Sequence, residues 1–211
     1  EEAKRACGFY ASWFGPPPAW TGYTIVEIPE GWGSQANPEG MLLASDAFTN
    51  PEEVDGLYHE LAHLWWVKSK EEYVSRFFDE GIASYMQLLA EKHLISEERF
   101  EAKLNRIKEM FKRMVGKRPE LLEVPIADYG KHGLTDASYF MGAFVLYNLH
   151  LRIGDEKFRE VIRRLVKAGS ERGVTFEDFR RILVETCGEE YSKFLDDWIY
   201  GTKPAQLLAK A

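Results

Sequence analysis

The chain has 211 residues, of which 45% are hydrophobic and 29% charged, and its formal net charge is −7. This is the balance of an ordinary globular domain, and an acidic chain without a long basic run is not expected to bind nucleic acid. No stretch approaches 18 uninterrupted apolar residues and no signal peptide is visible, so the sequence predicts a soluble domain without a membrane segment. The first residue is Glu1 and not Met, so additional domains in a longer parent chain are possible. The compartment is left open.

Residues 1–48 are predicted to form a short helix followed by a small sheet. The stretch "GFYASWFG" has helical character and is stopped by Gly15 and the three prolines after it. The stretches "YTIVEIP" and "GMLLAS" are short and β-rich, with a turn containing Gly, Pro and Asn between them. The two cysteines, Cys7 and Cys187, are far apart in sequence and are expected to be buried thiols, although a single disulfide is possible.

Residues 49–211 are predicted to form a helical lobe. Asn50 and Pro51, followed by two acids, are typical of a helix start. Apolar residues from Phe100 to Met114 recur at spacings of four and three, which predicts an amphipathic helix that begins near Ser96. The fold class is therefore α+β and mostly helical, in a single domain.

Boundaries in the second half are predicted from capping residues and glycines. Helix starts are expected at Thr135, Asp155 and Thr175. Helix ends are expected near Gly154, Gly169 and Gly188. The stretch 116–133 is rich in Gly and Pro and is expected to be a mostly irregular connection.

The stretch "LYHELAHLWW", Leu57 to Trp66, carries the first chemical signal. On a helix, His59 and His63 lie one turn apart on the same face, where two imidazoles can bind one zinc ion. Glu60 is rotated by about 100° from His59, close enough to reach a water at that metal without being a ligand. The alternative is that both histidines are core residues of a half-buried helix.

A zinc enzyme of this kind needs a third ligand. Position 66 is Trp and position 69 is Ser, which excludes the H-E-x-x-H-x-x-G-x-x-H arrangement. Glu80 in "FFDEGIASYMQLL" is the candidate, and the small residues Gly81, Ala83 and Ser84 after it would let this helix approach the first one closely. The alternative for Glu80 is a solvated acid in the first turn of a helix.

Three stretches, "HELAHLWW", "FFDEGIASY" and "SYFMGAFVLYNL", resemble the catalytic domain of the aminopeptidase N family of gluzincin zinc metallopeptidases. This family also includes a leukotriene epoxide hydrolase. The resemblance implies a thermolysin-like fold, with a small sheet packed on a helical lobe. It also implies one zinc ion per chain, bound by His59, His63 and Glu80, with Glu60 as the general base and Tyr139 as the tyrosine that stabilises the oxyanion.

The chain departs from the family pattern at several positions. The spacing to Glu80 is two residues short, which predicts a trimmed loop around Lys68 to Val74. Asp79 replaces the usual Asn, and Met141 the usual Lys. Gln87 stands where the family commonly has a glutamate that supports a zinc-binding histidine, and an amide oxygen can still accept an imidazole N–H there.

One departure concerns specificity. Aminopeptidases of this family hold the substrate's free α-amine with a glutamate in Gly-x-Met-Glu-Asn, whereas the corresponding region here reads "SQANPEGMLLAS". Glu39 is the only carboxylate in that region and is out of register with the motif. Hydrolysis is therefore better supported than exopeptidase specificity.

The predicted function is that of a zinc metallopeptidase, in which a zinc-activated water attacks a peptide or protein substrate and Glu60 acts as general base. Two alternatives remain. One is a degenerate, non-catalytic domain of a larger assembly, and the other is a zinc hydrolase that cleaves an ester or epoxide.

Overall fold

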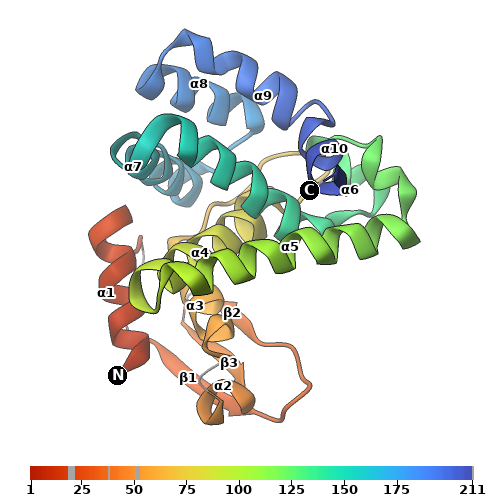
Figure 1. Cartoon of the computed structure of the whole chain (residues 1–211). Coiled ribbons are helices and arrows are strands. Elements are labelled where there is room, and N and C mark those ends of the chain that lie inside the picture. The colour runs from red at the N-terminus through yellow and green to blue at the C-terminus, as the bar shows by residue number, and fades with distance from the viewer. Residues whose placement is uncertain (19–21, 38, 51–52, 211) are drawn as a thin grey trace.

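The computed structural model describes residues 1–18, 22–37, 39–50 and 53–210. A small sheet lies at one end of the molecule and a stack of helices makes up the rest (Figure 1). This arrangement confirms the α+β, mostly helical class predicted from the sequence. Within the described residues, no helix is both long enough and apolar enough to span a membrane. Cys7 and Cys187 are both free thiols.

The sheet has three strands in the order β1-β3-β2. The predicted strands are β1 (Thr24–Ile28) and β3 (Gly40–Ala44), which pair in parallel. The strand β2 (Gln35–Asn37) was not predicted, because three residues are too few to show an alternating pattern; it pairs antiparallel with β3. Met41 and Leu43 point into the core, while Leu42 between them is 42% exposed, so only one face of β3 is buried.

The helical body surrounds α4, which packs against α3, α5 and α7 (Figure 1). The helices are α1 (Glu2–Phe14), α2 (Asp46–Thr49), α3 (Val54–Ala62), α4 (Ile82–Leu94), α5 (Glu97–Lys117), α6 (Tyr129–His132), α7 (Ser138–Arg172), α8 (Phe176–Cys187), α9 (Ser192–Trp198) and α10 (Lys203–Lys210). Short 3-10 turns connect several of them, and a π-helical turn, Phe77–Gly81, precedes α4.

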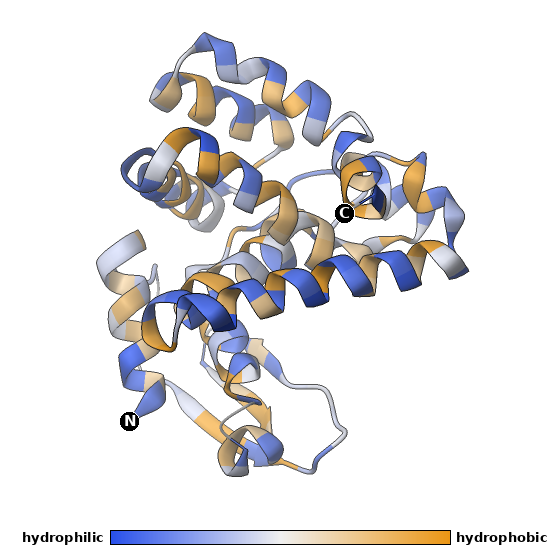
Figure 2. Cartoon of the chain, in the orientation of Figure 1, coloured by the Kyte–Doolittle hydropathy of each residue, from blue (hydrophilic) through white to orange (hydrophobic). Residues whose placement is uncertain are grey.

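The amphipathic helix predicted from residue 96 is α5, and its prediction is confirmed in detail. Ser96 is the N-cap, and its Oγ accepts a hydrogen bond from the backbone N–H of Arg99 at 3.2 Å. Of the predicted apolar positions, those from Phe100 to Phe111 are buried and Met114 is partly buried, while the outer face is polar (Figure 2). Thr175 is likewise the predicted N-cap of α8, where it forms a capping box with Asp178.

Two other predicted boundaries lie a few residues away from the observed ones. Asn50 is the C-cap of the short helix α2, and α3 begins at Val54 with Glu53 as its N-cap. Pro51 and Glu52 lie outside the described residues. Gly169 does not end a helix but lies inside α7, where a Cβ would come within 2.9 Å of the Cα of Val67. Its small size serves close packing.

Two further expectations were correct only in part. Gly154, an expected helix end, has a left-handed φ of 75° and kinks α7, but the chain turns helical again directly after it. The connection 116–133 is not mostly irregular, because it contains two 3-10 turns and α6.

The predicted close approach at Gly81 exists, but with a different partner. A Cβ added to Gly81 would lie 3.0 Å from the Cα of Gly142 in α7, so these two glycines let α7 cross the start of α4 in direct backbone contact. This crossing brings Tyr139, in the first turn of α7, next to the turn that carries Glu80.

Candidate metal centre

His59 and His63 are held in place by contacts between α1 and the end of α3. His59 lies in the last turn of α3, and His63 begins the 3-10 turn that follows it. Tyr10 of α1 donates a hydrogen bond to the carbonyl of Tyr58 at 3.0 Å, and Trp65 donates its indole N–H to the carbonyl of Gly15 at 2.7 Å. Both anchors are buried, so the two imidazoles project from a fixed backbone.

Glu80 approaches the histidines from a π-helical turn. The segment 66–76, between the 3-10 turn that follows α3 and this π-helical turn, contains no helix, as expected for the loop predicted around Lys68 to Val74. Ser138 of α7 donates its hydroxyl to the carbonyl of Ser75, which ties this segment to α7. Helical turns of the π type occur frequently at functional sites. Here the turn directs the Glu80 side chain toward α3.

The three predicted ligands converge on one point. Glu80 Oε2 lies 3.1 Å from His59 Nε2 and 3.4 Å from His63 Nε2, and the ligand atoms all lie within 4.8 Å of one another. Tetrahedral zinc with bonds of about 2.0–2.1 Å requires ligand atoms about 3.3–3.4 Å apart. The donor types and the spacing therefore fit zinc. Among the described residues, no other cluster of His, Cys, Asp and Glu meets the same criterion.

The charges of the three groups are coupled. Burial alone would raise the pKa of Glu80, but hydrogen bonds and charge interactions with His59 and His63 outweigh it and hold this pKa well below its usual range. Burial would lower the pKa of His63, but Glu80 outweighs it and raises that pKa. Glu80 is thus an ionised carboxylate at neutral pH, ready to bind a cation.

Glu60 and Tyr139 lie beside this cluster. Glu60 is only 7% exposed, and burial raises the pKa of its carboxyl although both histidines oppose the change. The Tyr139 ring stacks on His59, with ring centroids 5.8 Å apart. Burial, followed by the negative charge of Glu80, raises the pKa of Tyr139, so its hydroxyl stays protonated and can donate a hydrogen bond.

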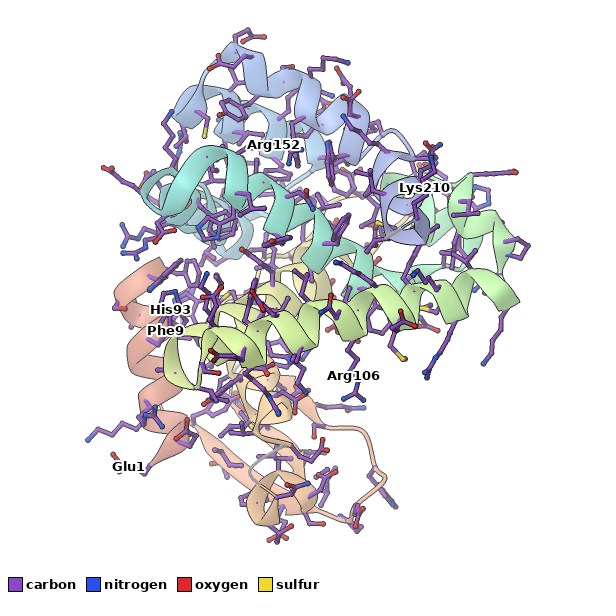
Figure 3. The ribbon with its side chains drawn as sticks, in the orientation of Figure 1. Glu1, Phe9, His93, Arg106, Arg152 and Lys210 are labelled. Atoms are coloured by element: carbon purple, nitrogen blue, oxygen red, sulfur yellow. The ribbon has the colours of Figure 1, made fainter. Side chains whose placement is uncertain are left out.

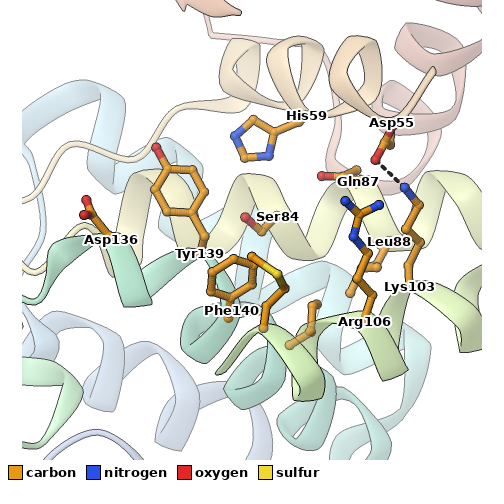
Figure 4. Close-up of a pocket in the computed structure, with 12 residues that line it drawn as sticks. Asp55, His59, Ser84, Gln87, Leu88, Lys103, Arg106, Asp136, Tyr139 and Phe140 are labelled. Atoms are coloured by element: carbon orange, nitrogen blue, oxygen red, sulfur yellow. Dashed lines mark hydrogen bonds and ion pairs between the residues drawn. The ribbon is translucent and has the colours of Figure 1, made fainter. Parts of the chain in front are cut away.

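Gln87 is one helical turn before a buried acid on α4. Its Nε2 donates to Glu91 Oε1 at 2.9 Å, and Glu91 also accepts from Arg99 at 2.9 Å. Because the amide nitrogen is engaged there, the amide oxygen points the other way, toward the side of the pocket where His59 lies (Figure 4). A contact between Gln87 and His59 remains a prediction.

All six residues predicted for the site line one cleft with a volume of about 840 Å³. They are His59, Glu60, His63, Glu80, Gln87 and Tyr139. The unpredicted strand β2 forms another part of the wall through Gln35, Ala36 and Asn37. None of these three is acidic, and Glu39 is not among the described residues of the wall, in agreement with the missing α-amine motif.

Arg76 is a residue of this site that the sequence analysis did not identify. It has a left-handed backbone, with φ of 68°, unusual for a residue with a side chain. Its Nε donates to Asp79 at 2.7 Å and its Nη2 to Glu80 Oε1, which leaves Oε2 of Glu80 to face the histidines. The only sequence signal was a cation four residues before an acid.

A family model, described as the peptidase family M1 domain, matches residues 1–198. The chain belongs to peptidase family M1. Similar curated proteins include a leucyl aminopeptidase of Saccharolobus solfataricus, 24% identical over 96% of this chain and 28% of its own length. Another is human aminopeptidase O, 25% identical over 86% of this chain and 27% of its own length. The M1 domain described here therefore spans about a quarter of the length of such relatives.

Solved structures of an M1 zinc metallopeptidase from Deinococcus radiodurans share the fold. One, a mutant bound to a Tyr-Ser-Ala substrate, superposes with a TM-score of 0.71 at 22% identity over 94% of this chain and 42% of that chain. The form without a mutation gives a TM-score of 0.70 at 23% identity, over 95% of this chain and 44% of that one. The predicted membership of the aminopeptidase N-like gluzincins and the thermolysin-like α+β fold are thus confirmed.

Proposed function

We propose that this M1 domain is a zinc metallopeptidase that hydrolyses peptide bonds, with residues 1–211 acting as a single catalytic domain. The observation that carries the proposal is the convergence of His59, His63 and Glu80 in one cleft with a buried Glu60 that is not part of the ligand set. Family membership and the aminopeptidase names of similar proteins support the same conclusion.

One zinc ion per chain would be held by His59, His63 and Glu80. A zinc ion bound there supplies a Lewis acid that polarises the scissile carbonyl and acidifies a water molecule. Glu60 takes up the proton of the attacking water. Because burial raises the pKa of Glu60, its conjugate acid is weak enough to hold that proton and then transfer it to the leaving amine.

Tyr139 stabilises the charge that develops on the carbonyl oxygen. Its hydroxyl is protonated at neutral pH, and its ring is positioned against His59, at the edge of the ligand cluster. A donor fixed in this way before reaction typically lowers the barrier by about 3 kcal/mol. Gln87 would accept the outer N–H of His59 and fix the orientation of that ring.

The substrate would bind beside β2, whose residues line the same cleft as the ligand cluster. Since β2 carries no carboxylate among its described residues, nothing on this wall would hold a free α-amine. The described residues of β2 therefore do not by themselves restrict cleavage to the N-terminal bond. Further domains of a longer parent chain, as in the longer relatives, could add that restriction.

The experiment combines metal analysis with a substrate panel. Purified chain reconstituted with zinc should contain one zinc ion and hydrolyse unblocked peptides, and Glu60→Gln should retain the zinc and lose activity. Hydrolysis of esters or epoxides but not of peptides would replace the peptidase proposal. A chain that binds zinc stoichiometrically but hydrolyses none of these substrates is the non-catalytic alternative.

A further inference from the structure

A second cavity, of about 320 Å³, opens from the cleft between α4, α5 and α7 (Figure 4). It shares Asp55, His59, Gln87 and Tyr139 with the cleft, so the two cavities adjoin. A group bound in it would lie directly beside the candidate zinc ligand His59. The volume is at the lower end of the range for small-molecule sites, suited to one part of a substrate.

The lining of this side pocket is apolar at its base and charged at its rim. Four apolar side chains from α4, α5 and α7 form the base: Leu88, Ile107, Met110 and Phe140. Two cations from α5, Lys103 and Arg106, lie on one side of the pocket, with Asp55 of α3 next to Lys103 (Figure 4). The pocket therefore suits a group with an apolar stem and a polar end.

The two cations differ in their partners. Lys103 forms an ion pair with Asp55, and both side chains are largely buried, at 13% and 21% exposure. Arg106 is exposed, projects from α5 toward α3 and the sheet (Figure 3), and is joined by no hydrogen bond or ion pair to another of the described residues. The charge of Lys103 is compensated and that of Arg106 is not.

Arg106 also points into the pocket and not away from it. In Figure 4 its guanidinium is drawn between Gln87 and the end of Lys103, and all three residues line the pocket. The remaining acid of the lining, Asp136, lies on the far side of Tyr139 from Arg106 (Figure 4). The carboxylate at the Arg106 end is Asp55, and it is paired with Lys103. An anion in the pocket would thus meet a guanidinium that has no ion-pair partner among the described residues.

We propose that Arg106 binds a carboxylate of the peptide substrate and so gives this site a preference for acidic peptides. A guanidinium binds a carboxylate through two parallel N–H···O hydrogen bonds, which gives direction as well as strength. The carboxylate is either an acidic side chain or the free C-terminus of a short peptide. This inference rests on the proposed function, because it names the substrate class of the same cleft.

The test measures binding without turnover, in zinc-loaded protein that carries Glu60→Gln. Matched peptides differ at one position by Glu or Gln, and a second set differs by a C-terminal acid or amide. In at least one set the acidic peptide should bind about 5- to 10-fold more tightly than its neutral partner, and the difference should shrink at high salt. The set that shows the difference identifies the source of the carboxylate.

Arg106→Gln should remove the difference between acidic and neutral peptides. Arg113→Gln is the matched control, since Arg113 is exposed on the same helix and lines neither cavity, and it should keep the difference. Equal binding of the acidic and neutral peptides, or a difference that persists in Arg106→Gln, would overturn the inference. Hydrolysis is measured separately in protein that keeps Glu60. If acidic peptides bind through Arg106 but no peptide is hydrolysed, the proposed function is overturned and the inference stands. If peptides are hydrolysed but acidic and neutral peptides bind equally, the inference is overturned and the proposed function stands.

Discussion

His59 and His150 each contact a carboxylate, but their surroundings differ. His59 Nε2 faces Glu80 together with His63, and all three line an open cleft. At His150, by contrast, Nδ1 contacts the Tyr85 hydroxyl at 2.7 Å and Nε2 contacts Asp155 at 2.9 Å. The His150 ring also stacks on Phe158 with centroids 4.2 Å apart.

The difference lies in what is left for a ligand. Both ring nitrogens of His150 have a partner, whereas His59 and His63 direct their Nε2 atoms at one carboxylate oxygen. Burial lowers the pKa of His150, although Asp155 opposes this, so the ring is neutral: Nε2 donates to Asp155 and Nδ1 accepts from Tyr85. A contact between imidazole and carboxylate is thus not sufficient for a metal site; convergence is required.

Replacing one histidine from each cluster tests this contrast most strongly. His59→Ala removes one of three ligands, so zinc affinity should fall by more than about 100-fold, beyond the loss typical for an outer partner. His150→Phe should still bind one zinc ion per chain. Chelator competition and elemental analysis measure both. Equal zinc content in the two variants would show that the cluster at His59 is not the metal centre.

Glu60→Gln separates catalysis from metal binding within the first cluster. The amide cannot accept the proton of the attacking water, so kcat should fall by about 10²–10⁴-fold while zinc content stays at the parent level. The measurement is peptide hydrolysis together with elemental analysis of the same samples. A parallel loss of zinc and activity would instead make Glu60 a structural residue.

Tyr139→Phe should have the next largest effect. Removing one hydrogen-bond donor to a developing oxyanion typically lowers kcat by about 10²–10³-fold. The stacked ring is retained, so zinc affinity and thermal stability should change little. An unaltered kcat would leave Tyr139 as a packing residue only.

Substitutions of Gln87 test whether this residue orients the imidazole ring of His59. Gln87→Leu removes the amide oxygen that faces the side of His59, and zinc affinity should fall by about 10–100-fold. Gln87→Glu should bind zinc at least as tightly as the parent. Identical affinities across the three forms would contradict a role for Gln87 in supporting His59.

The smallest expected effect concerns stability at the second cluster. His150→Phe leaves the Tyr85 hydroxyl without its partner, which should cost about 1–3 kcal/mol of unfolding free energy. The folded-state pKa of His150 lies below its unfolded value of about 6.5, so its contribution is full above that pH and is lost as the pH falls. His150→Phe should therefore weaken the decline of stability below about pH 6.5.

Denaturant titrations of parent and variant at several pH values measure this decline. Part of it should persist in His150→Phe, because burial also lowers the pKa of the neighbouring His93, with Lys92 acting in the same direction. An identical pH profile in the two proteins would contradict the assignment of a neutral His150.

Much of the metal centre could be predicted because its geometry is local. The spacing of His59 and His63 fixes their common face once the segment is helical. Helix α5 could be predicted for the same reason, because its capping residue Ser96 and its apolar period act over a few residues. Strand β2 could not be predicted, since it is stabilised by pairing with β3. Arg76 was missed although its partners Asp79 and Glu80 are close in sequence, because its left-handed backbone has no signal in the residue type.

The sequence by itself therefore determined which residue types could bind zinc and which helices would carry them, because helical periodicity is a property of neighbouring residues. Only the tertiary structure decided how Glu80 and Tyr139 meet His59, since this depends on α7 crossing α4 at Gly81 and Gly142, which are 61 positions apart in the chain. The same packing decided that the charge of Lys103 is paired with Asp55, whereas Arg106 has no ion-pair partner in the part of the chain that the structure describes, because ion pairing is set by distance in space and not by order along the chain.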